Sequence, residues 1–146
     1  MIELKHIEHS ADLAASFPVM KELRPQLADQ ATYIVQVEHQ RAQGYRLLAA
    51  WLDGAIVGLA GYRLQDNLLY GRFVYVDDLV VTATLHRAGI GQRLLEAVRQ
   101  QAIALRCKHF VLDTGLHMAL AQRFYFRQGL LARGMHFVEA LSQEST

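Results

Sequence analysis

Alternating apolar and polar side chains and helical periodicities divide the chain into predicted strands and helices. Residues Ile2–Ile7 alternate, which predicts an early or edge strand. Two helices are predicted between Ala11 and about Gly44, with a break near Leu23-Arg24-Pro25. Pro18 leaves open whether the first helix is broken or a turn of helix begins there.

Turn residues delimit the elements that follow. Asp53-Gly54 joins two apolar runs, Tyr45–Leu52 and Ala55–Leu64, and this dipeptide favours a tight hairpin turn with positive backbone dihedrals. The remaining predicted elements are strands over Gly71–Val81, Phe110–Asp113 and Met135–Leu141, and helices over Gln92–Leu105 and Ala119–Gln128. Residues Ser142–Thr146 are predicted to be a frayed tail. Periodicity alone therefore predicts a mixture of strands and helices, without their topology.

Composition narrows the class of protein. Of 146 residues, 52% are hydrophobic and 20% charged, which predicts one folded domain over residues 1–146. The net charge of +1 and the lack of a dense Lys/Arg block argue against a nucleic-acid partner. We expect a cytoplasmic protein without a membrane partner, because the start Met1–His6 has no leader character, no run reaches ~20 apolar residues, and Cys107 is the single cysteine. No metal site is predicted, since the seven histidines lack ligand spacing.

A glycine-rich turn carries the first chemical signal. The segment His86-Arg87-Ala88-Gly89-Ile90-Gly91 lies between the apolar run Leu79-Val80-Val81 and a helix starting near Gln92. Glycines let main-chain N–H groups approach an anion, and the helix start adds unpaired donors and a positive dipole end. This order of strand, turn and helix predicts a phosphate site with Arg87 as a countercharge. The alternative is a turn that serves only tight packing.

Two common phosphate motifs do not fit this turn. A dinucleotide-binding fingerprint needs a third glycine, and that position is Leu94. The Gly-Lys-Ser/Thr sequence of a P-loop is absent.

A second segment identifies a family resemblance. Residues Ala121–Leu130 read Ala-Gln-Arg-Phe-Tyr-Phe-Arg-Gln-Gly-Leu, a predicted helix that ends at Gly129. With the glycine-rich turn, this segment resembles the GNAT superfamily of acetyl-CoA-dependent N-acetyltransferases in order and separation, and the likeness runs from about Leu23 to Leu141. The chain departs from the family pattern at His86, where Gln or Arg is usual, at Leu130 for the common Phe, and at Met118 for a coenzyme-contacting Asn.

The resemblance implies a fold and a cosubstrate. The fold would be α/β (α+β), with a central, mixed but mostly antiparallel sheet of about seven strands that splays between strands four and five, flanked by about four helices. Acetyl-CoA would be held by its pyrophosphate on the turn and by its pantetheine arm along the strand edge. The implied coenzyme-binding residues are Leu79, Val80, Val81, His86, Arg87, Ala88, Gly89, Ile90, Gly91 and Gln92.

The same resemblance suggests catalytic residues. Tyr125 is the candidate general acid that protonates the leaving thiolate. The alternative is that Tyr125 only packs in the core. Asp77 and Asp78 are the candidate bases, with Asp77 first because alternation places it on the face of Tyr75 and Leu79, and Asp78 opposite it unless the strand bulges. One aspartate could equally bind a substrate cation or cap an element.

Two further residues are weaker candidates for the acceptor side of the site. Tyr75 is a candidate substrate contact, and His117 could orient the substrate or coenzyme, or serve only as a surface or capping residue.

Three functional hypotheses remain at this point. The leading one is an N-acetyltransferase that moves an acetyl group from acetyl-CoA to a primary amine of a small molecule, peptide or lysine by direct attack in a ternary complex. The alternatives are a non-catalytic acyl-CoA-binding sensor or subunit, and a structural domain whose glycine turn binds nothing. The sequence specifies neither the acceptor amine nor a preference for another acyl-CoA. The family resemblance suggests a homodimer, for which the predicted strand Met135–Leu141 could supply the contact.

Overall fold

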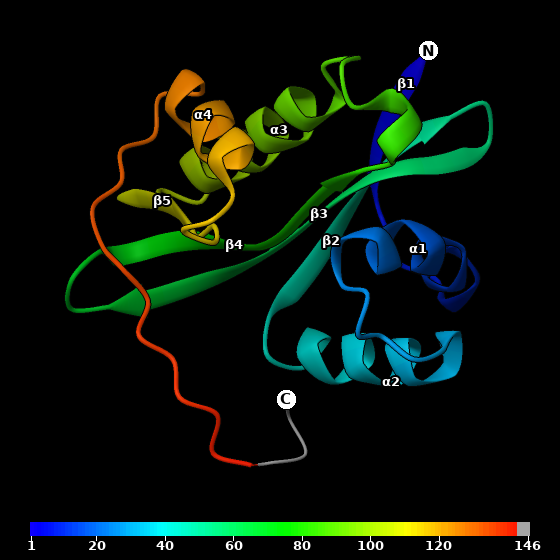
Figure 1. Cartoon of the computed structure of the whole chain (residues 1–146), viewed down its shortest axis with the longest axis horizontal. Helices are drawn as coiled ribbons and strands as arrows, with labels where there is room; N and C mark the ends of the chain where they lie inside the picture. The colour runs from blue at the N-terminus through cyan, green and yellow to red at the C-terminus, as the bar shows by residue number, and fades with distance from the viewer. Residues whose placement is uncertain (143–146) are drawn as a thin grey trace. The chain divides into compact units, whose positions relative to one another are not determined.

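The computed structural model describes residues 1–142, which form five strands and four α-helices (Figure 1). The strands are β1 (Ile2–His6), β2 (Tyr45–Leu52), β3 (Ala55–Asn67), β4 (Gly71–Val81) and β5 (His109–Leu112). The helices are α1 (Ser10–Leu23), α2 (Gln30–Arg41), α3 (Ile90–Ala104) and α4 (Ala119–Arg127), with a short 3-10 turn, η1 (Ala83–Leu85), after β4. The chain divides into two compact units, Met1–Asp113 and the part from Thr114 onward.

One open sheet organises the first unit. Its strand order is β1-β2-β3-β4-β5, in which β4 and β5 are parallel and every other pair is antiparallel. The Asp53-Gly54 hairpin turn has the positive backbone angles that the sequence predicts, with φ of 50° and 81°. β5 pairs with β4 only over Phe73–Val76, so the two strands separate beyond Val76. The mixed, mostly antiparallel sheet and its splay are therefore confirmed.

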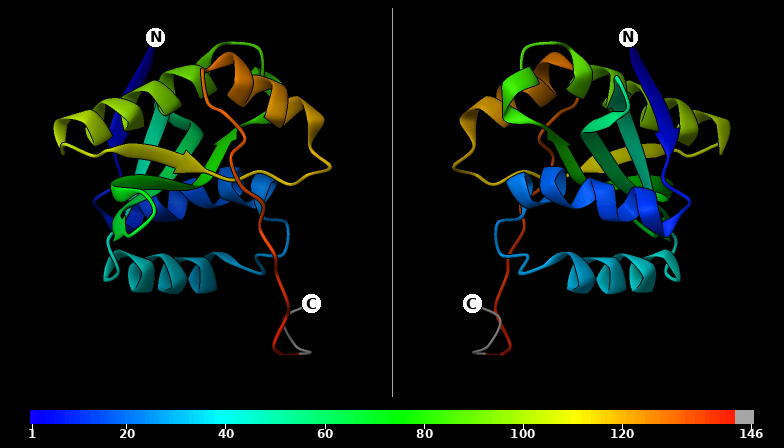
Figure 2. Two further views of the ribbon diagram at one scale, coloured as in Figure 1. Left: turned by 90° about the vertical axis from the view of Figure 1, so that its left-hand side faces the viewer. Right: turned by 90° about the vertical axis from the view of Figure 1, so that its right-hand side faces the viewer.

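Helices cover both faces of this sheet. Figures 1 and 2 show α3 on one face and α1 and α2 on the other. On the α3 face, Leu94 and Val98 pack against Val74 and Val76 of β4. On the other face, Leu13 of α1 packs with Leu59 of β3 in a second buried cluster. The sheet thus separates two apolar cores, and a side chain's position along a strand decides which core it enters.

Pro18 lies inside α1 without ending it. A proline cannot donate to the carbonyl four residues earlier, which here belongs to Ala14. The side-chain amide of Gln30 donates to that carbonyl oxygen instead, at 2.9 Å. The first helix therefore continues to Leu23, and the break predicted near Leu23-Arg24-Pro25 is confirmed.

The predicted strand over Met135–Leu141 is wrong. Residues 130–140 form neither helix nor strand, and the large side chains of Met135, Phe137 and Leu141 are exposed. Apolar alternation favours a strand only where a neighbouring strand pairs with its backbone, and no strand within residues 1–142 pairs with this segment. The sheet has five strands where about seven were expected.

The single domain over 1–146 stays a prediction. Of the predicted tail 142–146, residues 143–146 lie outside the described part of the chain. Within the residues described, no helix combines the length and apolar character needed to cross a membrane.

Candidate active site

A bulge in β4 brings both candidate aspartates to one face of the sheet. Asp78 pairs with Gly61 of β3, but Val76 pairs with Tyr62, so Asp77 is an extra residue on β4. Such a bulge lets two successive side chains point to the same side. Alternation alone would place Asp78 on the face opposite to Asp77; the bulge places both on the face covered by α1 and α2.

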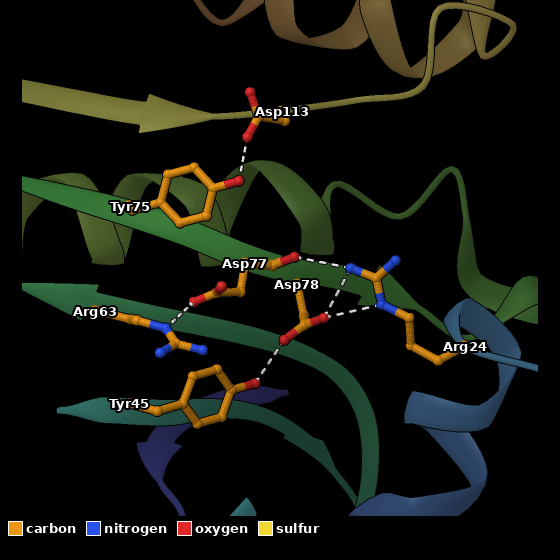
Figure 3. Close-up of polar contacts among 7 residues, drawn as sticks. All are labelled: Arg24, Tyr45, Arg63, Tyr75, Asp77, Asp78 and Asp113. Atoms are coloured by element: carbon orange, nitrogen blue, oxygen red, sulfur yellow. Dashed lines mark hydrogen bonds and ion pairs between the residues drawn. The ribbon is translucent and has the colours of Figure 1, made fainter. Parts of the chain in front are cut away.

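Asp78 is held by residues from two other elements (Figure 3). Arg24, in the loop after α1, donates from Nε and Nη2 to Asp78 Oδ1 at 3.0 and 2.9 Å. Tyr45 of β2 donates from its hydroxyl to Asp78 Oδ2 at 2.8 Å. The Asp78 side chain is only 15% exposed, so these three hydrogen bonds replace most of its hydration.

Asp77 is held less completely. Arg63 of β3 donates from Nε to Asp77 Oδ2 at 2.9 Å, whereas Oδ1 has no hydrogen-bond partner within the described chain. Burial raises the pKa of Asp77 above its ordinary value, although Arg63 acts in the opposite direction. Asp77 is thus a carboxylate with one open oxygen and an increased affinity for a proton.

The contact between Tyr45 and Asp78 depends on a glycine in the strand between them. β3 lies between β2 and β4, and Gly61 is the β3 residue over which the Tyr45 ring passes. A Cβ at Gly61 would collide with the Tyr45 hydroxyl and ring. Gly61 is therefore required by the close approach of the aromatic side chain, and its backbone angles are those of an ordinary strand.

Tyr75 lies on the same face of β4, at the point where β5 ends. Its hydroxyl donates to Asp113, the residue that follows β5 by one position (Figure 3). Burial and this carboxylate raise the pKa of Tyr75 far above its ordinary value. The predicted substrate contact Tyr75 therefore presents a neutral hydroxyl that already has a hydrogen-bond acceptor.

Along the last residues of β4, one backbone edge has no neighbouring strand from residues 1–142. Leu79, Val80 and Val81 pair with β3 on one side, and β5 has already ended its pairing at Val76. Since the N–H of Thr82 bonds to Val57 of β3, antiparallel alternation turns the peptide groups of Val80 toward β3 and those of Leu79 and Val81 toward the open edge. This edge can accept an extended ligand as an additional strand.

The glycine-rich turn follows that edge directly. Gly89 caps α3 in the left-handed conformation, with φ of 77°, and Gly91 lies in the first helical turn. The first N–H group with a partner inside α3 is that of Arg93, bonded to the Gly89 carbonyl at 3.2 Å. The amides of Ile90, Gly91 and Gln92 therefore remain as the open donors of a helix start, and the Ile90 side chain is buried beneath them.

The remaining predicted coenzyme-binding residues lie in or next to this turn. His86 Nε2 lies 2.8 Å from the Val81 carbonyl oxygen, so the imidazole occupies one acceptor of the open edge. The Ala88 N–H bonds to Leu85, which closes the turn. Arg87 is exposed beside it. The structure thus brings His86–Gln92 together with the end of β4, as the sequence predicts.

Tyr125 and His117 belong to the second unit. Tyr125 lies on α4, whose end is closed by Gly129 at φ of 90° and by the Leu130 N–H bonded to the Tyr125 carbonyl at 3.1 Å. His117 lies in the loop before α4, and its ring occupies the space next to Gly115. The predicted helix with a left-handed glycine at its end is confirmed.

Sequence reasoning missed four residues that hold the carboxylates and the turn: Arg24, Tyr45, Arg63 and Glu22. Glu22, at the end of α1, accepts from the Thr82 hydroxyl and from the Ala83 N–H, at 2.7 and 3.0 Å. Arg24 and Tyr45 are 54 and 33 positions away from Asp78 in the sequence, and Arg63 is 14 positions away from Asp77. Glu22 is 60 and 61 positions away from Thr82 and Ala83. The signal available was that two successive aspartates in a predicted strand require compensating charges.

Comparisons with known proteins identify a family and relatives of this chain. The profile described as Acetyltransferase (GNAT) family matches residues 9–130. An uncharacterized N-acetyltransferase of Bacillus subtilis (strain 168), YhdJ, is 32% identical over 126 residues, covering 86% of this chain and 88% of that protein. An IAA acetyltransferase of Azospirillum brasilense is 27% identical over 80% of this chain and 76% of its own length.

A solved structure shows the same fold. The aminoglycoside N-acetyltransferase AAC(6')-Iy, solved in complex with CoA, superposes with a TM-score of 0.85 at 16% identity, covering 97% of this chain and 96% of that one. The sequence resemblance is thereby confirmed at the level of fold.

Proposed function

Because the chain belongs to the GNAT acetyltransferase family, we propose that it transfers an acetyl group from acetyl-CoA to a primary amine. The observation that carries the proposal is the continuity of two main-chain features. The open edge of β4 at Leu79–Val81 runs into the turn at Gly89, beyond which α3 presents its unpaired N–H groups. A ligand with an extended amide-containing arm and a diphosphate matches this arrangement.

In the proposed binding mode, the glycine-rich turn and the open edge of β4 bind different parts of the coenzyme. The amides of Ile90, Gly91 and Gln92 hold the pyrophosphate, with the exposed Arg87 as countercharge. The pantetheine arm pairs with the Leu79 and Val81 peptide groups, and an N–H of this edge faces the thioester oxygen as negative charge develops there. His86 must leave the Val81 carbonyl if the arm uses that acceptor.

Direct transfer requires an amine with a free lone pair. We assign the base to Asp77 because its Oδ1 is open and burial raises the pKa of its carboxyl. Asp78 is fully engaged by Arg24 and Tyr45, so its part is to fix the bulge and the side chains around it. The amine, once deprotonated, attacks the thioester carbonyl carbon; the acetyl C–N bond forms as the C–S bond breaks.

The leaving thiolate needs a proton. Tyr125 is the proposed donor: burial raises the pKa of its phenol, so the group retains its proton at neutral pH. No residue in the described chain need form an acyl-enzyme intermediate in this scheme, and the reaction runs in a ternary complex.

The test is release of free CoA thiol from acetyl-CoA in the presence of a library of amines. Amine-dependent thiol release supports the enzyme. Tight binding of acetyl-CoA without release by any amine favours the sensor or subunit, and absence of binding favours the structural domain.

A further inference from the structure

A hollow of about 140 Å³ opens beside Asp78 on the face of the sheet covered by α1 and α2. Its apolar wall includes Met20, Leu27 and Val37, and its polar wall includes Arg24 and Asp78. A cavity of about 150 Å³ accommodates benzene. The hollow is therefore large enough for a short carbon chain or a small ring with a polar end.

The charges around this hollow are already paired. Arg24 balances Asp78, and Arg63 balances Asp77. Polycationic ligands are usually recognised by uncompensated carboxylates. Two carboxylates matched by two guanidinium groups leave no excess charge of either sign, so a charged acceptor would be recognised through the individual hydrogen-bond donors that stay open.

The Arg24 guanidinium keeps charged hydrogen-bond donors open in the hollow. Tyr33 is engaged with Ser16 and Tyr45 with Asp78, so both phenols of the wall are occupied. The Arg24 guanidinium uses Nε and Nη2, while its Nη1 has no hydrogen-bond partner within residues 1–142.

Two glutamines of α2 add to these donors. Gln36 and Gln40 line the hollow, and their side-chain amides have no hydrogen bond to any described residue. Gln36 is exposed and Gln40 half-buried, and each amide group provides two N–H donors as well as a carbonyl acceptor. Together with Arg24, which remains 42% exposed, their amide N–H groups can donate to an anionic group bound in the hollow.

We propose that this hollow binds an anionic group of the acceptor, so that the acceptor is a small molecule carrying a primary amine together with a carboxylate or phosphate. The inference rests on the proposed acetyl transfer and specifies its substrate class. Arg24 binds the anion as a charged donor, Gln36 and Gln40 complete its hydrogen bonds, and the apolar wall contacts the carbon chain that links anion and amine. Asp77, on the same face of β4, then accepts the proton of the amine.

The experiment compares matched acceptors in the thiol-release assay. The set contains straight-chain amino acids of two to six carbons, the carboxamide and the parent alkylamine of each, the aminoalkylphosphonates, and spermidine as a polycation. We expect the best anionic acceptor to exceed its neutral counterparts at least tenfold in kcat/KM, mainly through KM. The carboxylate and phosphonate members distinguish the two sources of the anion.

Variants test whether this preference arises in the hollow. Arg24→Gln and, independently, Gln36→Leu are expected to reduce the ratio of anionic to neutral kcat/KM to about threefold or less. The ratio is the readout, because a general loss of folded protein lowers both rates equally. Arg46→Gln is the control: this β2 arginine pairs with Glu8 instead, and the ratio should stay unchanged.

The outcomes separate the two proposals. Turnover of neutral amines or spermidine as fast as of anionic acceptors overturns the inference and leaves acetyl transfer intact. A wild-type preference that survives in both Arg24→Gln and Gln36→Leu also overturns it. Absence of thiol release with every amine overturns the acetyl-transfer proposal itself.

Discussion

The hydroxyl of Tyr45 donates to Asp78 at 2.8 Å, although these residues belong to strands that are separated in the sheet by β3. The contact crosses Gly61, the strand position without a side chain. It fixes the carboxylate at the bulge where β4 and β5 separate. One tyrosine therefore connects the apolar core beneath α1 and α2 to the polar group at the proposed site.

Replacing Gly61 with alanine should break the hydrogen bond between Tyr45 and Asp78. The new methyl group would overlap the Tyr45 ring, and overpacking of this kind costs about 1–3 kcal/mol. We expect a lower free energy of unfolding in urea and reduced turnover. Gly134→Ala is the control, because its Cβ would meet open space; equal stability of the two variants would contradict the proposed collision.

Gly89→Ala tests the turn that holds the pyrophosphate. Alanine is strained at φ of 77°, and the expected cost is about 1 kcal/mol of stability. Its matched control is Gly44→Ala, which also has positive φ and open space, at the end of a different loop. Titration calorimetry should show weaker acetyl-CoA binding for Gly89→Ala alone. Equal affinities in the two variants would remove the turn from coenzyme recognition.

Tyr125→Phe tests the proposed acid. Loss of a general acid typically lowers the rate by about 10²–10⁴-fold, so kcat should fall strongly while the melting temperature changes little. Tyr70→Phe serves as control, because Tyr70 lies in the loop between β3 and β4. Unchanged turnover in Tyr125→Phe would leave the residue with a packing role.

The pH dependence of activity tests the assignment of the base. Asp77 accepts a proton only when ionised, so its contribution to kcat/KM grows as pH rises through its pKa. Burial raises that pKa above the ordinary 3.8, which shifts the rise to higher pH. The amine titrates identically in all variants, so the ratio of wild-type to Asp77→Asn activity isolates this group. The ratio should rise with pH and then level at about 10²-fold.

Asp78→Asn is the comparison for this profile. It weakens the contacts to Arg24 and Tyr45 but leaves the proposed base in place. We expect a lower plateau and a pH-dependent rise that persists but lies at lower pH, because the Asp78 charge contributes to raising the pKa of Asp77. A profile that loses its pH-dependent rise in Asp78→Asn and retains it in Asp77→Asn would reverse the two roles.

Local signals predicted much of this molecule. The Asp53-Gly54 hairpin, the strand over Gly71–Val81 and the helix end at Gly129 follow from local sequence signals. The partners of Asp78 do not, since Arg24 and Tyr45 meet it only after the sheet and α1 have packed. The strand predicted at Met135–Leu141 had a suitable alternation, but no strand in the described part of the chain pairs with it.

The most direct measurement of the central claim is a crystal structure with bound CoA. The account predicts the pyrophosphate on the amides of Ile90, Gly91 and Gln92, and the pantetheine arm paired with the open edge at Leu79–Val81. A diphosphate bound elsewhere, or an arm that avoids this edge, would contradict it.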